Sequence, residues 1–362
     1  MLTHHDLRVA DSVVRVAVDP SAGTGSTVWP SIGEYPIYNA SLYQVLSEDQ
    51  ARNQRFSDAL RTLVPNKVSL DIGTGQHLNW ARECLGHGAD HVLAMEVMAE
   101  TFRVASANLR RWGLTDKITL LEGASTSLRI EPRAQVCVAE VIGSIAGAEG
   151  AAATFADARR RHLTEDGVVV PDHCMTRAAA VCLRAVLDQH DVAFSPDAIE
   201  HLARIFDWNQ APFDVRLRIR NPATEGVVST DEPVEILDLN GDLRVEQERP
   251  VELVMERPGR VDGILLWLQL RCRSGEPPLD TLREQTSWAS VYFPLFDTEI
   301  PVRRGDRLDL LFRTALSDDG IHPDYEVSAV LHTAGGVHRA RHVSPHHGRT
   351  FRSRPLYRRL FP

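Results

Sequence analysis

The segment KVSLDIGTG, residues 67–75, has the pattern of a short apolar strand that ends in a glycine-rich turn. A helix-like stretch follows, and a second apolar strand, HVLAMEV, covers residues 91–97. A helical pattern at 99–113 then precedes two more apolar strands, at 117–123 and 134–143. Strands that alternate with helices of about 10–15 residues are typical of right-handed βαβ units and a parallel sheet. This part of the chain is therefore predicted to form a Rossmann-like domain.

The pattern changes after the segment VVVPDHC, which ends at residue 174. Strand-like runs separated by Gly, Pro and Asp turns follow, and they predict an antiparallel, β-barrel-like second domain. Residues 187–213 are an exception, because their apolar residues recur at helical spacing. An amphipathic arm of this kind packs on its own barrel or on another subunit.

We therefore divide the chain into three regions. Residues 1–55 form an N-terminal segment and a helix that covers the cofactor, and residues 1–33 within it are expected to be a flexible lead-in. Residues 56–172 form the Rossmann-like domain. Residues 173–362 form the barrel-like domain, with the arm inserted at 187–213.

Composition narrows the possible partners. The chain has 362 residues and a formal net charge of −9, which argues against nucleic acid or an anionic membrane as the main partner. Its 5 cysteines are widely spaced and lack the CxxC or Cys/His grouping of a zinc site, so we expect reduced thiols and no metal. The N-terminal stretch has no apolar core of a signal peptide, and the apolar runs are short. We therefore expect a cytoplasmic protein.

The glycine-rich turn predicts a nucleotide-like ligand. Asp71 ends its strand, while Gly73 and Gly75 allow the backbone to pass close to a ligand at a helix N-terminus. Glu96 ends the next strand, where an acidic side chain accepts hydrogen bonds from ribose hydroxyls. The turn lacks the GxGxxG of dinucleotide enzymes and the Gly-Lys-Ser/Thr of a triphosphate site. S-adenosylmethionine, which has a ribose but no phosphate, fits better than NAD or ATP.

Two glutamates follow the last of these strands, Glu140 and Glu149 in AEVIGSIAGAEG, residues 139–150. Any single glutamate is more often a solvated loop residue. A pair beside a cofactor site can instead bind a cation in a fixed orientation, or accept a proton if burial raises one pKa.

At this point the chain resembles the protein arginine methyltransferase family. Five segments carry the resemblance in the family's order: YQVLSEDQARNQRF (43–56), LDIGTG with MEV (70–75 and 95–97), AEVIGSIAGAEG (139–150), RRHLTEDGVVVPDHC (160–174) and QTSWASVYFPLFDTEIPVRRGD (285–306). The sequence of the loop that carries Glu140 and Glu149, the double-Glu loop, is closer to that of the family's monomethylating branch. The resemblance implies a class I S-adenosylmethionine-dependent methyltransferase with a helical dimerisation arm, and a ring-like homodimer in which this arm docks on a second subunit.

The resemblance also implies roles for individual residues. Arg52 would pair with the methionine carboxylate of the cofactor, a contact that suits a guanidinium. Gly73 and Gly75 would face the cofactor and Glu96 would hold its ribose. The remaining cofactor positions are Ala124 and Ser125 along the adenine edge, and Tyr43, a looser match.

On the acceptor side, Glu140 and Glu149 would line the pocket. The family's Thr-His-Trp loop is here Thr286-Ser287-Trp288, so Asp49 loses the imidazole that would relay a proton and keeps at best the Ser287 hydroxyl. Leu46 and Ala151 replace methionines of the family. These departures predict a wider, more apolar pocket with a weakened proton relay.

The cofactor side keeps the residues of the family, whereas the acceptor side departs from them. We therefore consider three hypotheses. In the first, the enzyme methylates a small molecule of specialised metabolism on nitrogen or carbon, for example an indole. In the alternative, it monomethylates arginine in a peptide or protein. A third, more remote hypothesis is a non-catalytic methyltransferase-like scaffold.

Overall fold

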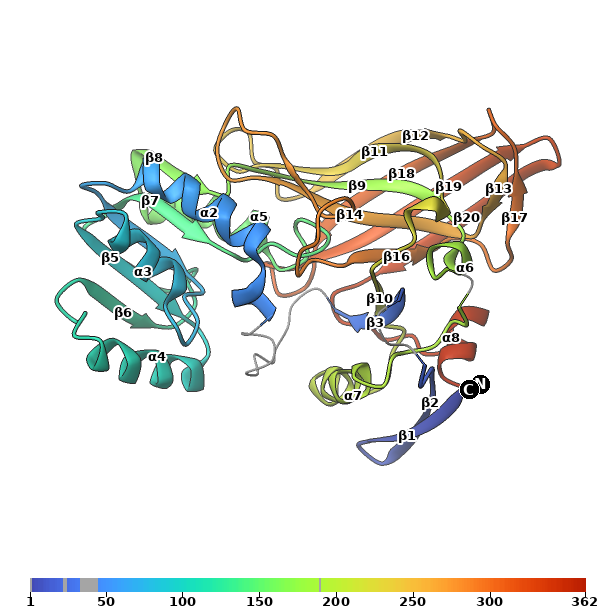
Figure 1. Cartoon of the computed structure of the whole chain (residues 1–362), viewed down its shortest axis with the longest axis horizontal. Coiled ribbons are helices and arrows are strands. Elements are labelled where there is room, and N and C mark those ends of the chain that lie inside the picture. The colour runs from blue at the N-terminus through green and yellow to red at the C-terminus, as the bar shows by residue number, and fades with distance from the viewer. Residues whose placement is uncertain (1, 22–24, 33–44, 189) are drawn as a thin grey trace.

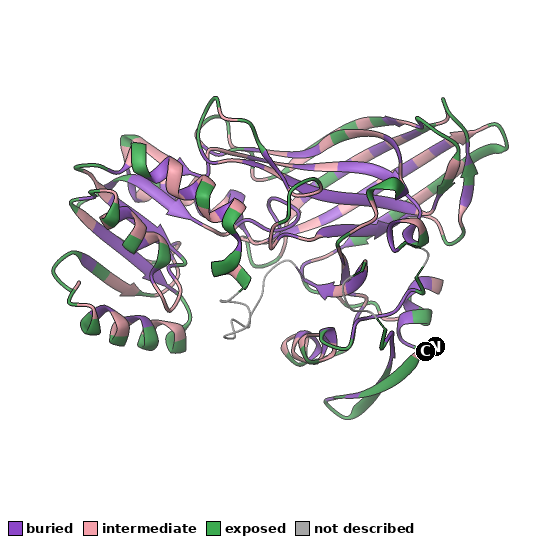
Figure 2. Ribbon diagram, in the orientation of Figure 1, coloured by how far each residue is buried: buried purple, intermediate pink, exposed green. Residues whose placement is uncertain are grey.

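The computed structural model describes residues 2–21, 25–32, 45–188 and 190–362. A parallel sheet with its helices forms one end of the molecule, and a larger set of antiparallel strands forms the other (Figure 1). Buried residues follow the strands of both parts (Figure 2).

The parallel sheet has 5 strands in the order β6-β5-β4-β7-β8. Its strands are β4 (Val68–Ile72), β5 (His91–Glu96), β6 (Ile118–Glu122), β7 (Ala134–Ala139) and β8 (Leu163–Val170). Its helices are α2 (Gln50–Leu63), α3 (Asn79–Gly86), α4 (Ala99–Arg111) and α5 (Ala151–Arg161). The strand order reverses between β4 and β7, and in open α/β sheets ligands bind at the carboxyl ends of the strands beside such a point. The predicted Rossmann-like fold is confirmed.

The antiparallel part contains a 7-stranded sheet in the order β11-β9-β14-β16-β10-β3, with β15 paired to β14. A 4-stranded sheet, β12-β18-β19-β20, and the pair β13-β17 complete it. The strands are β3 (Thr27–Ser31), β9 (His173–Val181), β10 (Arg216–Arg220), β11 (Val227–Asp238), β12 (Gln247–Val254), β13 (Gly259–Val261), β14 (Gly263–Arg271), β15 (Leu279–Asp280), β16 (Ser290–Pro294), β17 (Ile300–Val302), β18 (Arg307–Leu316), β19 (Pro323–Thr333) and β20 (Gly336–Ser344). This is the barrel-like second part that the sequence predicts. The domain bounds given above remain a proposal.

The N-terminal residues differ from the expected flexible lead-in. Strands β1 (Thr3–Val9) and β2 (Ser12–Val18) form a hairpin, and β3 pairs with β10 in the large sheet. The alternation in SVVRVAV explains the difference, because Val14 and Val16 are 2% and 0% exposed whereas Val13 and Arg15 face outward. A period of 2 of this kind indicates a strand with one buried face.

The predicted arm contains helix α7 (Ala198–Asn209). Its apolar face, which includes Leu202 and Phe206, belongs to a buried cluster shared with β1 to β3 and with α8 (Pro355–Leu360). The ring of Phe206 lies 5.7 Å from that of Phe361 (centroid to centroid), so the chain itself covers this face. Docking of the arm on a second subunit therefore stays a prediction. Two short helices, α6 (Leu183–Val186) and η1 (Thr224–Gly226), flank the arm region.

Candidate active site

The glycine-rich turn after β4 is built around a buried carboxylate. Asp71 is fully buried, and its Oδ2 accepts hydrogen bonds from Thr74 Oγ1 at 2.6 Å and from the Ala81 amide at 2.9 Å. Burial raises the pKa of Asp71 to about 7. Gly73 and Gly75 have φ of +75° and +67°, which other residues rarely adopt. Asp71 thus holds the turn that presents these glycines.

Glu96, at the end of β5, joins this turn. Its Oε2 accepts a hydrogen bond from the Gly75 amide at 3.0 Å, and its Oε1 accepts one from the Met98 amide at 2.9 Å. Burial raises the pKa of Glu96, although these amide hydrogen bonds oppose the shift. Glu96, the residue predicted to bind the ribose, therefore lies at the carboxyl ends of β4 and β5 against the predicted cofactor turn. Binding of a ribose by Glu96 stays a prediction.

Three other residues predicted to contact the cofactor, Ala124, Ser125 and Tyr43, lie outside this turn in the sequence. Ala124 and Ser125 follow β6, at the same edge of the sheet. The Ser125 carbonyl accepts hydrogen bonds from Arg161 Nη2 at 2.6 Å and from His162 Nε2 at 2.8 Å, which fixes the backbone there. Tyr43 lies outside the described residues.

Arg52 and Glu140 contact one another directly. Arg52 Nη1 lies 2.9 Å from Glu140 Oε2, and Arg52 Nη2 donates to the Leu46 carbonyl at 2.7 Å. The side chains are 4% and 16% exposed, so this ion pair is largely removed from water. Burial raises the pKa of Glu140 to about 7, while the Arg52 guanidinium opposes the shift. Arg218 of β10, a barrel residue that the sequence did not suggest, also lowers the pKa of Glu140.

Asp49 connects helix α2 to the barrel. One carboxylate oxygen caps the helix by accepting from the Arg52 amide at 3.0 Å. The other accepts from the Ser287 amide at 2.6 Å and from its hydroxyl at 2.8 Å. The expected hydrogen bond from the Ser287 hydroxyl to Asp49 is thus present, and the Ser287 amide donates a second one. The neighbouring Trp288 donates through Nε1 to the Ile142 carbonyl in the double-Glu loop at 2.7 Å.

The double-Glu loop, residues 140–150, is held mainly by barrel side chains. Glu235 of β11 is fully buried and accepts from the Gly147 amide at 3.1 Å. Thr176 of β9 donates to Glu235 at 2.8 Å and accepts from the Ala146 amide at 2.9 Å. Tyr325 of β19 donates to the other Glu235 oxygen at 3.3 Å. Sequence reasoning missed all three anchors, and the only signal was a glutamate inside the apolar run VEILDL.

The two halves of the site adjoin. A Cβ added to Gly73 would lie 3.8 Å from Val141 Cγ1, so the cofactor turn faces the residue after Glu140. A Cβ added to Gly143 would lie 3.4 Å from Cγ of Glu149, which places Glu149 back against the start of its loop. The structure therefore gathers Asp49, Arg52, Glu140, Ser287 and Trp288 beside the turn that holds Gly73.

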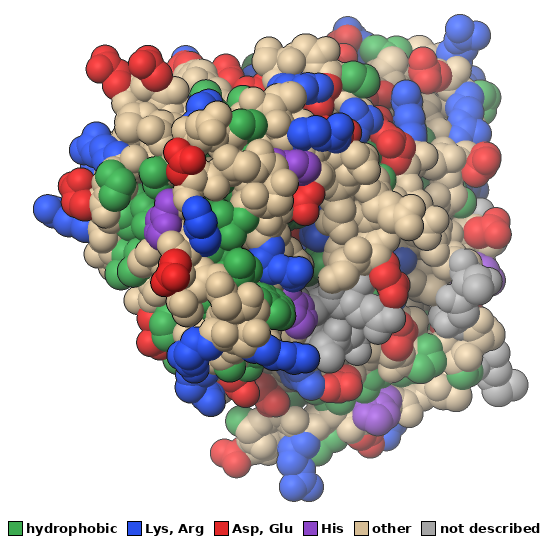
Figure 3. Space-filling view, turned by 60° about the vertical axis from the view of Figure 1, so that its left-hand side comes forward, with side chains coloured by type: hydrophobic (Ala, Val, Ile, Leu, Met, Phe, Trp, Pro, Cys, Tyr) green, Lys and Arg blue, Asp and Glu red, His purple; other side chains and the backbone are tan. Residues whose placement is uncertain are grey.

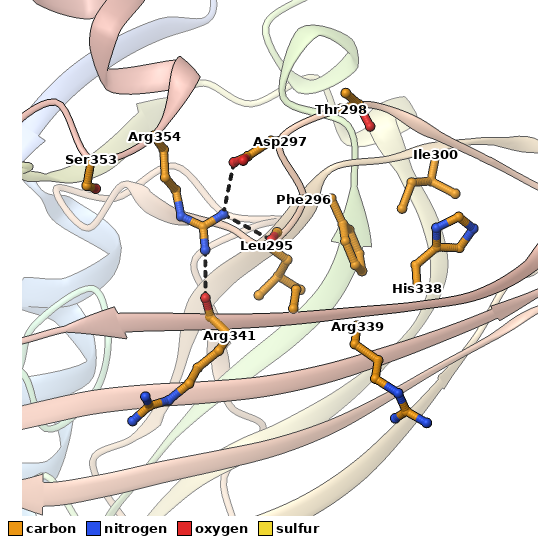
Figure 4. Close-up of a pocket in the computed structure, with 11 residues that line it drawn as sticks. Leu295, Phe296, Asp297, Thr298, Ile300, His338, Arg339, Arg341, Ser353 and Arg354 are labelled. Carbon is orange, nitrogen blue, oxygen red and sulfur yellow. Dashed lines mark hydrogen bonds and ion pairs between the residues drawn. The ribbon is translucent and has the colours of Figure 1, made fainter.

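A separate hollow of about 580 Å³ lies on the barrel, away from these residues. Arg354 points into it, but its guanidinium donates to the Leu295 carbonyl at 3.0 Å and to the Arg341 carbonyl at 2.6 Å (Figure 4). We assign no function to this hollow, because the guanidinium of Arg354 is already bound by the protein.

On the face shown in Figure 3, acidic and basic side chains are mixed over the described residues, without a continuous basic surface. Within the described part of the chain, no helix is long and apolar enough to cross a membrane. The 5 cysteines are free and buried.

Comparison with known proteins identifies the relatives of this chain. No protein-family model matches it. It is 23% identical over 288 residues to protein arginine N-methyltransferase 1 of Saccharomyces cerevisiae, covering 74% of this chain and 78% of the yeast protein. It is 26% identical over 283 residues to protein arginine N-methyltransferase 7 of Drosophila simulans, covering 70% of this chain but only 39% of the fly protein.

Solved structures agree with the sequence matches. Protein arginine methyltransferase 10 of Arabidopsis thaliana superposes with a TM-score of 0.67 at 18% identity, covering 84% of this chain and 97% of the other. The Trypanosoma brucei PRMT1 enzyme-prozyme heterotetrameric complex with AdoHcy gives 0.66 at 16% identity, covering 84% and 98%. The chain is related to the protein arginine methyltransferases.

This relationship to the protein arginine methyltransferases agrees with the predicted resemblance and supports the predicted fold class and cofactor. The chain is accordingly an S-adenosylmethionine-dependent methyltransferase. The roles of the individual residues stay predictions.

Proposed function

We propose that the chain is a peptide or protein arginine N-methyltransferase that adds one methyl group. The observation that supports this most is the double-Glu loop, whose Val141 lies against the cofactor turn and whose backbone the barrel fixes through Glu235 and Thr176. Glu140 binds a guanidinium, that of Arg52, at 2.9 Å within the protein itself, so this carboxylate is suited to the acceptor's chemical group. The names of the curated relatives point in the same direction.

In this proposal, Glu140 and Glu149 orient the acceptor guanidinium. Methyl transfer from a sulfonium is an in-line displacement, so the protein mainly has to hold the acceptor nitrogen on the axis of the S–CH3 bond. Carboxylates that bind the other guanidinium nitrogens draw positive charge away from the attacking one. Arg52, Gly73, Gly75 and Glu96 would hold the cofactor, with Arg52 exchanging Glu140 for the cofactor carboxylate.

A small-molecule acceptor is the second candidate. It is favoured by one observation, that Asp49 contacts a serine hydroxyl where the relatives' motif has an imidazole. A carboxylate hydrogen-bonded to a ring N–H, as in an indole, would direct electron density to the attacking ring carbon. The curated relatives do not support this candidate, so we place it second to arginine.

Methyl transfer from radiolabelled S-adenosylmethionine to arginine peptides and to a small-molecule panel tests the choice. Label in arginine peptides, lost when arginine is replaced by lysine, supports the proposal. Label confined to small molecules refutes it. Calorimetry with S-adenosylhomocysteine serves as a control, because absence of binding would indicate a scaffold.

Two further proposals concern the assembly and location of the chain. We propose a homodimer formed through the arm at 187–213, and light scattering that shows only monomer would contradict it. We also propose a cytoplasmic location, which the free, buried cysteines support. Fractionation of the native cells tests it.

A further inference from the structure

The turn between β18 and β19 carries a histidine held by a carboxylate. Asp319 Oδ1 accepts from Ser317 Oγ at 2.8 Å and from the amides of Ile321 at 2.8 Å and His322 at 2.9 Å. Its other oxygen, Oδ2, lies 2.6 Å from His322 Nδ1. Because three donors fix the carboxylate, it orients the imidazole and favours the tautomer with a proton on Nδ1.

The opposite edge of this imidazole faces the double-Glu loop. A Cβ added to Gly150 would lie 3.6 Å from Cδ2 of His322 and 2.6 Å from Cγ2 of Ile321. In an imidazole, Cδ2 is bonded to Nε2, so the edge of the ring that carries Nε2 is the one that faces Gly150, the residue after Glu149. The side chain of His322 is 12% exposed and that of Asp319 is 31% exposed, which leaves a route from the dyad to water.

A third side chain, His346, lies against the dyad. Its ring stacks on that of His322 at 4.1 Å (centroid to centroid) and 6° between planes, and its side chain is 2% exposed. Burial, followed by nearby positive groups, lowers the pKa of His346 to about 3, so it stays neutral. The three side chains resemble a metal ligand set. Imidazole lone pairs lie in the ring planes, however, and parallel planes do not converge on one ion.

We infer that the Asp319–His322 pair is a proton relay for the double-Glu pocket, with His322 acting on the acceptor through Glu149. This inference rests on the proposed function. As the acceptor nitrogen forms its bond to the methyl carbon, the S–CH3 bond breaks and its electron pair stays on sulfur. The N–H proton of the methylated group passes to Glu149 and then to Nε2 of His322, and the imidazolium releases it to water. Asp319 stabilises the imidazolium. His322 is a positioning residue, because it acts on the acceptor only through Glu149.

The relay has a test that needs no acceptor. The charged or titratable groups around His322 include Asp319 in its own turn, His346 and His347 after β20, and Arg216 of β10, which acts on His346. Glu149 precedes Gly150, the residue that the ring faces. Nitrogen-detected NMR of the full chain reports on the two ring nitrogens of His322. Glu149→Gln and Asp319→Asn should each change the chemical shifts of these nitrogens, because each replaces a carboxylate of the relay by an amide. His322 nitrogen shifts that stay unchanged in Glu149→Gln overturn the relay, whatever the acceptor.

Turnover gives the second test, with labelled S-adenosylmethionine and an arginine peptide. His322→Gln should lower kcat by about 100-fold with little change in KM, and should flatten the pH profile of kcat. The matched control is His332→Gln, which removes a similar pair on the same hairpin, with His332 Nε2 3.0 Å from Asp309 Oδ2. A kcat of His322→Gln within twofold of the control overturns the relay. Inactivation of the native enzyme by EDTA, reversed by Zn²⁺, would also overturn it, in favour of a metal site. If no arginine peptide is methylated, the proposed function fails while the NMR result still decides the relay.

Discussion

Arg52 Nη1 and Glu140 Oε2 lie 2.9 Å apart, so helix α2 and the double-Glu loop are joined by one buried ion pair. The sequence suggested separate partners for these side chains, the cofactor carboxylate for Arg52 and the acceptor for Glu140. Their contact means that a cofactor carboxylate would compete with Glu140 for the guanidinium. Binding of the cofactor would thus free Glu140 for the acceptor, which couples the two ligands.

Arg52→Lys should weaken binding of S-adenosylhomocysteine by about tenfold or more, because an ammonium keeps the charge but lacks the planar fork. Calorimetry measures the change. Arg55→Lys on the same helix is the control, because Arg55 donates to the Pro277 carbonyl on the outside of the site. Equal losses in the two variants would show that the effect comes from the helix and not from the cofactor contact.

Glu140→Gln should abolish methyl transfer while changing the affinity for S-adenosylhomocysteine much less. In the native enzyme, kcat/KM should rise with pH through about 7, because the carboxylate form binds a guanidinium and burial raises the pKa of Glu140 to about 7. Initial rates between pH 5.5 and about 8.5 measure this. A flat profile over that range would contradict the assignment, as would equal loss of binding and turnover in the variant.

The same carboxyl group should make folding stability depend on pH. The folded-state pKa of Glu140, about 7, exceeds its usual value of 4.5, so the folded protein binds the proton more tightly than the unfolded chain. Its contribution is therefore fully present below pH 4.5 and is lost as the pH rises through about 7. Urea unfolding should show the native protein losing more stability between pH 5 and about 8 than Glu140→Gln does. Asp71 has a shift of the same sign, but it is present in both proteins and cancels in the difference. Parallel curves would contradict this prediction.

Glu235→Gln should lower kcat by about tenfold or more without weakening cofactor binding. In the glutamine, an NH2 donor takes the place of one carboxylate oxygen, which in the native protein accepts a hydrogen bond from Gly147 or Tyr325. One anchor of the double-Glu loop is therefore lost. Glu232→Gln, an exposed position on the same strand β11, is the control. Gly147→Ala should mimic the effect, because its Cβ would lie 2.7 Å from Glu235 Oε1. If both variants turn over normally, the barrel does not set the loop.

The sequence predicted the parallel sheet well because its signals are local. Each strand from β4 to β7 is a short apolar run, and the turn at Gly73 follows its strand directly. Strand β3 was missed because its partner lies about half the chain away, as in the pairing of Trp29 with Arg218. No local pattern specifies such a partner. Strands β1 and β2 pair locally, and their alternation was a signal that the expectation of a flexible lead-in overlooked.

The site shows the same limit. Residue types and spacing indicated Glu140 and Glu149, and the family resemblance added Asp49, but the contact of Arg52 with Glu140 spans 88 residues. Glu235 is equally far from Gly147, at 88 residues, and a glutamate within a strand is more often solvated than a buried acceptor. Only the tertiary structure shows that the barrel supplies these anchors.

The anchoring of the double-Glu loop by β9, β11 and β19 also bears on how this protein can be engineered. A chimera that joins the nucleotide-binding half of one relative to the barrel of another would keep its cofactor turn, since Asp71 and Glu96 are bonded within that half. It would exchange the supports under the loop unless residues equivalent to Thr176, Glu235 and Tyr325 travelled with it. The unit of exchange is therefore the loop together with its three anchors, and not either domain alone.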